Sequence, residues 1–256
     1  QGEVDSVEGE AQAAATWKTS TVQHSAACGA QVRRTIVCAD ALAWMAAQDE
    51  LPGSVVTSMP DITEVSYMGL GVDSYCAWFV DAARLVLRKA PRDGVVIFYQ
   101  TDFRREGVWT DKSGLCFLAA QQEGARLLFH KVVCIAPPDS ADRNKPKPRY
   151  SHLVAYSCGF VDDMRDNTAD VLSDRGHMTW ERAMGLAACE VACEYILRKV
   201  PPARRTVVDP FCGHGSILAM ANALGMDAVG IERNRSRCRA ARKLSPAEIQ
   251  RQLGKK

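Results

Sequence analysis

The residues best suited to chemistry lie near the C-terminus, in the segment Asp209-Pro-Phe-Cys-Gly-His-Gly-Ser216. An apolar run, 206–208, precedes this segment and an apolar, helix-forming stretch follows it, so we expect it to link a strand to a helix. In that position glycines let the backbone pass close to a ligand, and the start of the helix exposes free N–H groups. The predicted ligand-binding residues of this loop are Asp209, Pro210, Phe211, Cys212, Gly213, Gly215 and Ser216.

An acidic residue after the next strand indicates the kind of ligand. Glu232 follows Gly215 by 17 residues and ends the apolar run 228–232, where a carboxylate can accept hydrogen bonds from both hydroxyls of a ribose. A dinucleotide loop would have a third glycine in the pattern GxGxxG, but Ile217 and Leu218 follow Ser216. The pattern favours a nucleoside-bearing cofactor other than NAD, and it disfavours a structural turn with an exposed acid.

The late position of the loop predicts a permuted order of the two halves of the site. Only 41 residues follow Gly215, too few for the other strands of a doubly wound sheet, so the substrate half is expected to come first. The ends of two earlier strands, 34–38 and 54–57, then face the ligand crevice. They lead into Asp40 and into the loop Ser58-Met-Pro-Asp61, where Pro60 interrupts strand pairing.

These elements alternate as in an α/β sheet. Strands are expected at 34–38, 54–57, 95–99, 126–136, 152–158, 206–209 and 228–232. Helices are expected at 41–48, 75–89, 181–199 and 218–224, followed by a basic helical tail. The strands 126–136 and 152–158 form a predicted edge hairpin with a long loop between them.

The glycine loop, the strand Gly230-Ile-Glu232 and the order of the motifs resemble the S-adenosylmethionine-dependent amino-methyltransferases of nucleic-acid bases, in particular the permuted β-class of DNA and RNA enzymes. The resemblance runs from about 34 to 244. It implies a Rossmann-like class I methyltransferase sheet, mostly parallel with an antiparallel edge hairpin, and S-adenosyl-L-methionine as cofactor. It places Asp40 at the adenine amino group and Thr179 near the methionine moiety. From the residues alone, Asp40 also fits a helix cap for 41–48, and Thr179 fits a cap for the next helix equally well.

The family pattern for the catalytic loop is Asp, Asn or Ser, then two prolines, then an aromatic residue that stacks on the base. Ser58 and Pro60 match it, and Asp61 replaces the aromatic ring. An exocyclic amino nitrogen is a poor nucleophile because its lone pair is delocalised, so hydrogen-bond acceptors must localise that pair. The resemblance therefore implies Ser58 and the Pro60 carbonyl as catalytic groups of a direct methyl transfer that needs no metal. Asp61 departs from the pattern, and we expect it to accept a proton or hydrogen bond from the amine, with Tyr67 or Tyr75 as stacking face.

The aspartate at position 61 leaves three functions open. The chain is a base methyltransferase, a methyltransferase-like assembly or RNA-binding protein that has lost catalysis, or a methyltransferase for a protein or small-molecule amine that Asp61 would anchor. Gln100 and Asp102 follow the strand 95–99 and are predicted either to contact the acceptor or to form a plain turn.

Two basic segments are candidates for phosphate contact. Lys145, Lys147 and Arg149 alternate with prolines in the hairpin loop, which stiffens it and makes it the better candidate. The arginines of 233–242 are spaced by two along a predicted helix, which scatters them around its axis and favours a solvated face.

Composition sets the remaining expectations. With 256 residues, 47% of them hydrophobic, the chain can form one methyltransferase domain, 26–256, behind an acidic tail, 1–25, that we expect to be disordered. The net charge of +2 gives no general attraction to nucleic acid; RNA is preferred over DNA because no inserted block is large enough for a separate sequence-reading domain. Ten cysteines without CxxC pairs indicate reduced thiols and an intracellular reducing compartment. No apolar run approaches the ~20 residues of a membrane span, and no oligomeric state is favoured.

Overall fold

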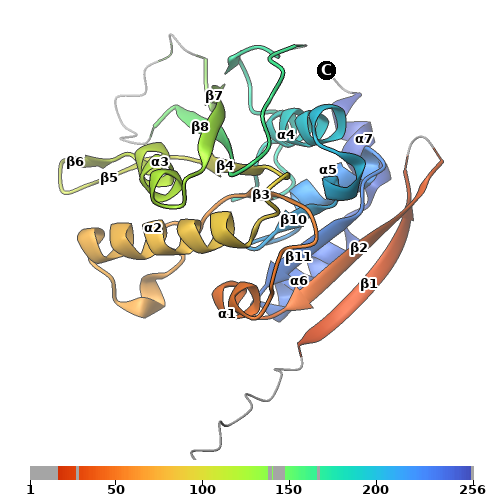
Figure 1. The fold of residues 1–256 in the computed structure, drawn as a ribbon, viewed down its shortest axis with the longest axis horizontal. Coiled ribbons are helices and arrows are strands. Elements are labelled where there is room, and N and C mark those ends of the chain that lie inside the picture. The colour runs from red at the N-terminus through yellow and green to blue at the C-terminus, as the bar shows by residue number, and fades with distance from the viewer. Residues whose placement is uncertain (1–16, 27–28, 138–139, 141–147, 166–167, 255–256) are drawn as a thin grey trace, which may run out of the picture.

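The protein is an α/β fold built on a nine-stranded sheet, seen here in a computed structural model (Figure 1). The structure describes residues 17–26, 29–137, 140, 148–165 and 168–254. The strands of the main sheet are β1 Lys18–Ser25, β2 Gln31–Cys38, β3 Ser54–Thr57, β4 Val96–Gln100, β7 Arg126–Cys134, β8 Tyr150–Ser157, β9 Val171–Leu172, β10 Val207–Asp209 and β11 Ala228–Glu232.

The strand order confirms the predicted fold class. Along the sheet the order is β1-β2-β11-β10-β3-β4-β8-β7-β9. Five adjacent strands are parallel to one another: β2, β11, β10, β3 and β4. In contrast, β8 is antiparallel to both β4 and β7, as predicted for the hairpin at 126–158. Because β10 lies between β3 and β11, the loops that follow these three strands meet at one edge of the sheet.

Helices cover both faces of the sheet (Figure 1). One face carries α1 Ala41–Ala46, α2 Val72–Lys89 and α3 Lys112–Gln122. The other carries α4 Leu186–Lys199, α5 Ser216–Ala223, α6 Arg235–Lys243 and α7 Pro246–Leu253. A small hairpin of β5 Phe103–Arg105 and β6 Val108–Thr110 follows β4, and 3-10 turns lie at Ser66–Met68 and Pro202–Arg204.

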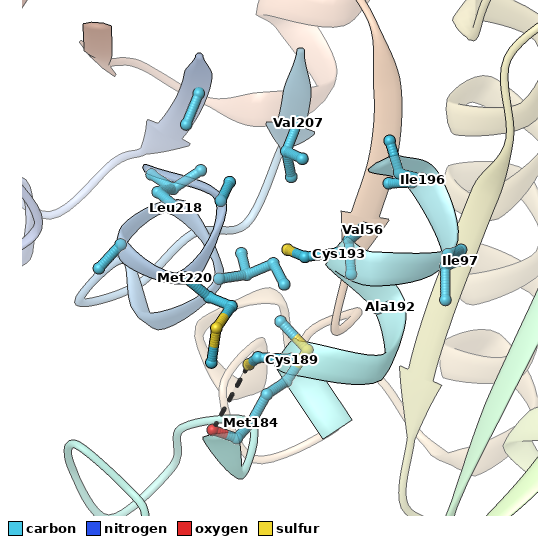
Figure 2. Packing of buried hydrophobic residues seen from close by; sticks show 14 of the residues in the cluster. Val56, Ile97, Met184, Cys189, Ala192, Cys193, Ile196, Val207, Leu218 and Met220 are labelled. Carbon is cyan, nitrogen blue, oxygen red and sulfur yellow. Dashed lines mark hydrogen bonds between the residues drawn. The ribbon is translucent and has the colours of Figure 1, made fainter. Parts of the chain in front are cut away.

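The core follows from strands that are apolar on both faces, as in other sheets covered by helices on each side. Side chains alternate along β4, so that Phe98 packs against the face of α2 and α3 while Ile97 packs against the face of α4 and α5. Figure 2 shows the core on the α4 and α5 face, in which Val56 and Val207 lie near α4 and Leu218 of α5. The central strands are thereby held rigidly beneath the loops at their ends.

Two predicted boundaries are wrong. The expected tail 1–25 includes an ordered strand, since β1 pairs antiparallel with β2 from Lys18 opposite Cys38 to Ser25 opposite Gln31. This edge strand was missed because most of its side chains are exposed and polar, which weakens its apolar alternation. Residues 1–16 lie outside the described part of the chain.

The helix predicted at 181–199 begins five residues later, at Leu186. Gly185 precedes the helix at a close backbone contact, where a Cβ atom would lie 2.0 Å from the carbonyl oxygen of Arg175. The residues 180–184 therefore precede the helix, and several of them line the site described below. The β5–β6 hairpin and α3 were also not predicted from the sequence.

Two further observations concern thiols and membrane spans. Each cysteine that the structure describes is a free thiol. Within the described ranges, none of the helices has the length and apolar character required to cross a membrane.

A buried arginine ties β2 to the helices of the C-terminal region. Arg34 is fully buried, and its Nε donates to Asn222 Oδ1 at 2.7 Å. Its Nη1 donates to the carbonyl oxygens of Ala241 at 2.8 Å and Leu244 at 2.6 Å. Burial lowers the pKa of Arg34 to about 10, so the guanidinium stays charged at neutral pH and holds the ends of α5 and α6 against the sheet.

We expect Arg34→Met to lower the free energy of unfolding by about 3 kcal/mol or more, because each buried acceptor left unpaired costs about 1–3 kcal/mol. Urea denaturation followed by circular dichroism measures the change. Arg33→Met is the matched control: the neighbouring side chain is 69% exposed and pairs with Asp227 at the surface, so it should lose no more than about 1 kcal/mol. Equal losses in the two variants would contradict this role for Arg34.

Candidate active site

A cavity of about 410 Å³ opens where the carboxyl ends of β3, β10 and β11 meet. Its size lies in the range of about 300–1,000 Å³ that is usual for small-molecule sites. Many of the residues predicted from the sequence line it: Asp40, Ser58, Pro60, Tyr67, Asp209, Pro210, Phe211, Cys212, Gly213, Ser216 and Glu232. The structure thus brings the predicted cofactor loop and most of the predicted catalytic loop to one cavity.

The glycine loop turns sharply between β10 and α5. Gly213 and Gly215 have φ values of 53° and 79°, in the left-handed region that favours glycine. A Cβ atom at Gly215 would also lie 3.0 Å from Cβ of Ala241. The N–H of Cys212 donates to the carbonyl of Ile231 at 3.0 Å, which fixes the loop to β11. Burial raises the pKa of the Cys212 thiol well above its ordinary value, consistent with a structural role and not a nucleophilic one.

Asp209 is a buried carboxyl at the base of the cavity. It accepts hydrogen bonds at Oδ1 from the Thr57 hydroxyl at 2.7 Å and from the N–H of Phe211 at 3.0 Å. Burial, with a smaller contribution from the nearby Glu232, raises the pKa of Asp209 to about 7 despite these two donors. A cationic group of a ligand would stabilise the charged form of this carboxyl.

Two further carboxylates flank the cavity from β11 and β2. Glu232 Oε1 accepts from the N–H of Asn234 at 2.6 Å, and burial raises the pKa of Glu232 above its ordinary value. Asp40 lines the cavity and at the same time caps α1, because its Oδ1 accepts from the N–H of Ala43 at 3.0 Å. The two interpretations of Asp40 left open by the sequence are therefore compatible.

The segment before α4 packs against the glycine loop. The ring of Trp180 stacks on His214 at 4.2 Å between centroids and 15° between planes. Thr179 shares a hydrogen bond with Ser216, the first residue of α5, through their hydroxyl groups. Thr179 is not a helix cap, since α4 begins only at Leu186. Sequence reasoning missed Trp180, although an aromatic residue adjacent to Thr179 was the signal available.

The cavity residues also contact one another through an ion pair and through cation–π contacts, one of which places Arg237 5.3 Å from the ring centroid of Trp180. Arg182 pairs with Glu64 at 3.4 Å. The guanidinium of Arg233 lies 4.0 Å from the ring centroid of Tyr67, which is 61% exposed. Tyr67 therefore remains available as a stacking surface, but one face of its ring is already covered by a cation.

Tyr75 does not provide the stacking face suggested by the sequence. It is fully buried, and its hydroxyl donates to the carbonyl oxygen of Pro60 at 2.8 Å. Tyr75 thus orients the catalytic loop from below. The carbonyl keeps a second lone pair that can accept another hydrogen bond.

The catalytic loop divides between two environments. Ser58 and Pro60 line the cavity, whereas Asp61 is not among the lining residues. Asp61 Oδ1 accepts from the N–H of Thr63 at 3.2 Å, and its Oδ2 lies 3.9 Å from Nζ of the buried Lys112. Sequence reasoning missed Lys112, because a lysine that begins an unrecognised helix carries no recognisable motif.

Gln100 and Asp102, predicted to contact the acceptor, do not reach the cavity. Gln100 is fully buried, and Asp102 is 5% exposed. Asp102 accepts from the N–H of Lys112 at 2.9 Å and from Trp109 Nε1 at 3.0 Å, and its Oδ2 lies 3.1 Å from His152 Nε2. The predicted contact with the acceptor is therefore wrong. The β5–β6 hairpin and α3 fold over this end of β4 and bury both side chains.

The predicted phosphate loop is only partly described. Arg149 donates to the Ser140 hydroxyl at 2.8 Å and is not part of the cavity. Lys145 and Lys147 lie outside the described residues. Their contact with phosphate therefore stays a prediction.

A parallel sheet with a glycine loop after one central strand, an acid after the next and a second loop on the other side defines the Rossmann-like class I methyltransferase fold. Here the second loop precedes the glycine loop in the chain, as in the permuted arrangement predicted above. Residues 191–243 match a family, N6_N4_Mtase, whose description is DNA methylase. This match covers most of α4, the glycine loop, β11 and α6, and it confirms the predicted resemblance.

Solved structures with the same fold include DNA methyltransferases. The PvuII DNA methyltransferase, which is cytosine-N4-specific, superposes with a TM-score of 0.62 at 15% identity, covering 86% of this chain and 91% of that one. A protein assigned as a DNA modification methylase from Thermus thermophilus, complexed with S-adenosyl-L-methionine, gives 0.60 at 15% identity and covers 86% and 95%.

A third structure, M1.HpyAVI in complex with S-adenosylmethionine, gives a TM-score of 0.54 at 14% identity and covers 81% of this chain and 97% of that one. At these identities the likeness establishes the fold. A comparison with curated proteins gives no match.

The raised pKa of Asp209 predicts a pH-dependent stability difference between the wild type and Asp209→Asn without cofactor. A carboxyl with a raised folded-state pKa contributes stability that is fully present below its unfolded pKa, near 3.8, and is lost as the pH rises through about 7. The variant should therefore become more stable than the wild type as the pH rises from 5 to 8, by at most about 4 kcal/mol. Thermal unfolding at several pH values measures this; a difference that is constant with pH would contradict it.

Proposed function

We propose that this protein is an S-adenosylmethionine-dependent N-methyltransferase that methylates an exocyclic amino group of a nucleic-acid base. The observation that carries the proposal is the single cavity that joins the glycine loop and Glu232 to Ser58 and Pro60. The two parts lie on adjacent strands, since β3 pairs with β10 and Thr57 bonds to Asp209. The family match and the fold agree with the predicted cofactor and enzyme class.

The residues present suit each part of this cofactor. Glu232 provides buried carboxylate oxygens for the ribose hydroxyls, and Asp40 provides an acceptor for the adenine amino group. Asp209 suits the cationic amino group of the methionine moiety, because a positive charge would offset the burial that raises the pKa of its carboxyl. Thr179 and Ser216, already bonded to each other, would complete this end.

When bound, the cofactor supplies an activated methyl group on a sulfonium. The protein must orient the acceptor amine and localise its lone pair. Ser58 and the Pro60 carbonyl are the acceptors at the cavity that suit the two amino hydrogens. The hydrogen bond from Tyr75 to the Pro60 oxygen keeps that carbonyl fixed.

DNA is the first acceptor to test. The sequence-based preference for RNA has no support in the comparisons, and its argument from size is weak: a protein assigned as a DNA modification methylase is covered to 95% of its length by this chain. We keep a nucleic acid as the partner class.

The alternative of a cationic protein or small-molecule amine rested on Asp61 as its anchor. Asp61 already faces the ammonium of Lys112, which disfavours a second cation at that carboxylate. The other alternative, a methyltransferase-like assembly or RNA-binding protein that has lost catalysis, also rested on Asp61. The intact cavity around Ser58 and Pro60 favours an active enzyme.

We also propose a reducing compartment. Cys116, Cys189 and Cys193 are fully buried free thiols, and burial raises the pKa of each one. They pack as small apolar side chains.

Glu232→Gln should weaken the binding of S-adenosylmethionine at least tenfold, because an amide cannot accept both ribose hydrogen bonds through equivalent oxygens. Isothermal titration calorimetry measures the dissociation constant. Glu248→Gln, on the exposed first turn of α7, is the control and should bind as the wild type does. Unchanged affinity in Glu232→Gln would exclude Glu232 from the cofactor site.

Methyl transfer should be visible with tritiated cofactor and separate pools of unmethylated DNA and total RNA. We expect label in nucleic acid that nuclease digestion releases as a methylated base, and a rate at least tenfold lower in Ser58→Ala because an acceptor for the amine is lost. Label in neither pool, from a protein that binds the cofactor, would contradict the proposed function.

A further inference from the structure

We propose that Lys112 is a positioning residue for the catalytic loop: its ammonium holds the carboxylate of Asp61 and thereby fixes the adjacent Pro60 carbonyl at the cavity. This inference rests on the proposed function and gives Asp61 and Lys112 distinct roles in it. Asp61 stands where the family pattern has an aromatic ring. The pair therefore replaces a stacking contact with a charged one.

The geometry of the pair is asymmetric. The Lys112 side chain is 4% exposed and that of Asp61 is 37% exposed, with 3.9 Å between Nζ and Oδ2. Lys112 Nζ also lies 5.5 Å from the ring centroid of Phe79. The cation is thus enclosed beneath the loop, while the carboxylate is partly exposed to solvent outside the lining of the cavity.

A network of hydrogen bonds fixes the start of α3, where Lys112 lies. The Lys112 N–H donates to Asp102, and Asp102 is bonded in turn to His152 at 3.1 Å. His152 Nδ1 lies 2.9 Å from His130 Nε2 on the neighbouring strand β7. The role of Asp102 is therefore to anchor Lys112, not to contact the acceptor as the sequence suggested.

The loop is fixed from its own side as well. The N–H of Asp61 donates to Glu64 Oε2 at 3.1 Å, and Asp61 Oδ1 accepts from Thr63. Tyr75 holds the preceding carbonyl, that of Pro60. Thr63 and Lys112 thus contact the two oxygens of the Asp61 carboxylate, the first from within the loop and the second from α3.

Stability alone does not account for Lys112. A buried ammonium loses its hydration, which costs several kcal/mol unless short ion pairs and hydrogen bonds compensate; burial accordingly lowers the pKa of Lys112. Its partner at 3.9 Å is a long contact. Buried charges with weak structural compensation are typical of functional sites.

A second buried polar group lies on the same side of the sheet. Gln100 shares the face of β4 that carries Phe98, in the cluster that includes Phe79. Both polar atoms of its side chain are buried and, among the described residues, have no hydrogen-bond partner. Gln100 and Lys112 are thus two buried polar side chains on this side of β4, at positions where apolar side chains would stabilise the fold more.

The proposed step is balanced. The amine lone pair forms a bond to the methyl carbon, the carbon–sulfur bond breaks, and its electrons stay on sulfur. The nitrogen then releases one proton to water. Lys112 keeps its proton throughout.

Lys112→Met tests the role, because methionine fills a similar volume without the charge. We expect an unchanged or higher Tm, binding of S-adenosylmethionine within twofold of the wild type, and a kcat for methyl transfer to unmethylated DNA or total RNA at least tenfold lower. Lys112→Arg should restore part of kcat, and the double variant Lys112→Met with Asp61→Asn should be no slower than Asp61→Asn alone.

Lys131→Met is the matched control. Lys131 is equally buried, but its Nζ donates to the carbonyls of Thr168 at 3.0 Å and Ala169 at 3.1 Å and pairs with Asp170 at 3.3 Å. Its replacement should lower the Tm and leave kcat unchanged.

A lower Tm in Lys112→Met with an unchanged kcat, or losses that add in the double variant, would overturn the proposal. If the wild type binds the cofactor but labels neither pool, the proposed function fails, and the Tm of Lys112→Met then tests the role of Lys112 separately. A fall in Tm as large as that of Lys131→Met would show that Lys112 is a structural residue. An unchanged or higher Tm would support a buried charge that is kept for function.

Discussion

The hydrogen bond from the Thr57 hydroxyl to the buried Asp209 carboxyl joins the strand before the catalytic loop to the strand before the glycine loop. It forms between neighbouring parallel strands, β3 and β10, whose backbone register is fixed by packing on both faces of the sheet. Because the two loops leave adjacent strands at the same edge, they share one cavity although about 150 residues separate them in the chain. The site depends on this pairing more than on any single loop residue.

The same edge concentrates groups that destabilise the fold. Asp209 and Glu232 are carboxyls whose pKa values burial raises, and Lys112 is an ammonium whose pKa burial lowers. The buried Arg34, by contrast, donates to three acceptors, and among its nitrogens only Nη2 has no hydrogen-bond partner within the described residues. Arg34 therefore stabilises the fold, whereas Asp209, Glu232 and Lys112 carry charges whose burial destabilises it. These three groups lie in or beside the proposed site.

The central sheet and the cofactor half of the site could be predicted because local signals agree there. Each of its features has a local sequence signal. Apolar runs predict the strands that end at Asp209 and Glu232, and the glycines between them predict a turn with left-handed φ values. The β1 strand could not be predicted because it is stabilised by pairing at an exposed edge. Lys112 and Trp180 depend on contacts across 51 and 34 residues, with Asp61 and His214, that no local pattern records.

The most direct test of the account is a calorimetric titration of the wild-type protein with S-adenosylmethionine, with NAD titrated in parallel. The shape and charge of the cavity predict saturable binding of S-adenosylmethionine with a micromolar dissociation constant and no heat with NAD, because the loop lacks the third glycine of a dinucleotide site. Absence of binding by S-adenosylmethionine, or tighter binding of NAD, would contradict the assignment of this cavity.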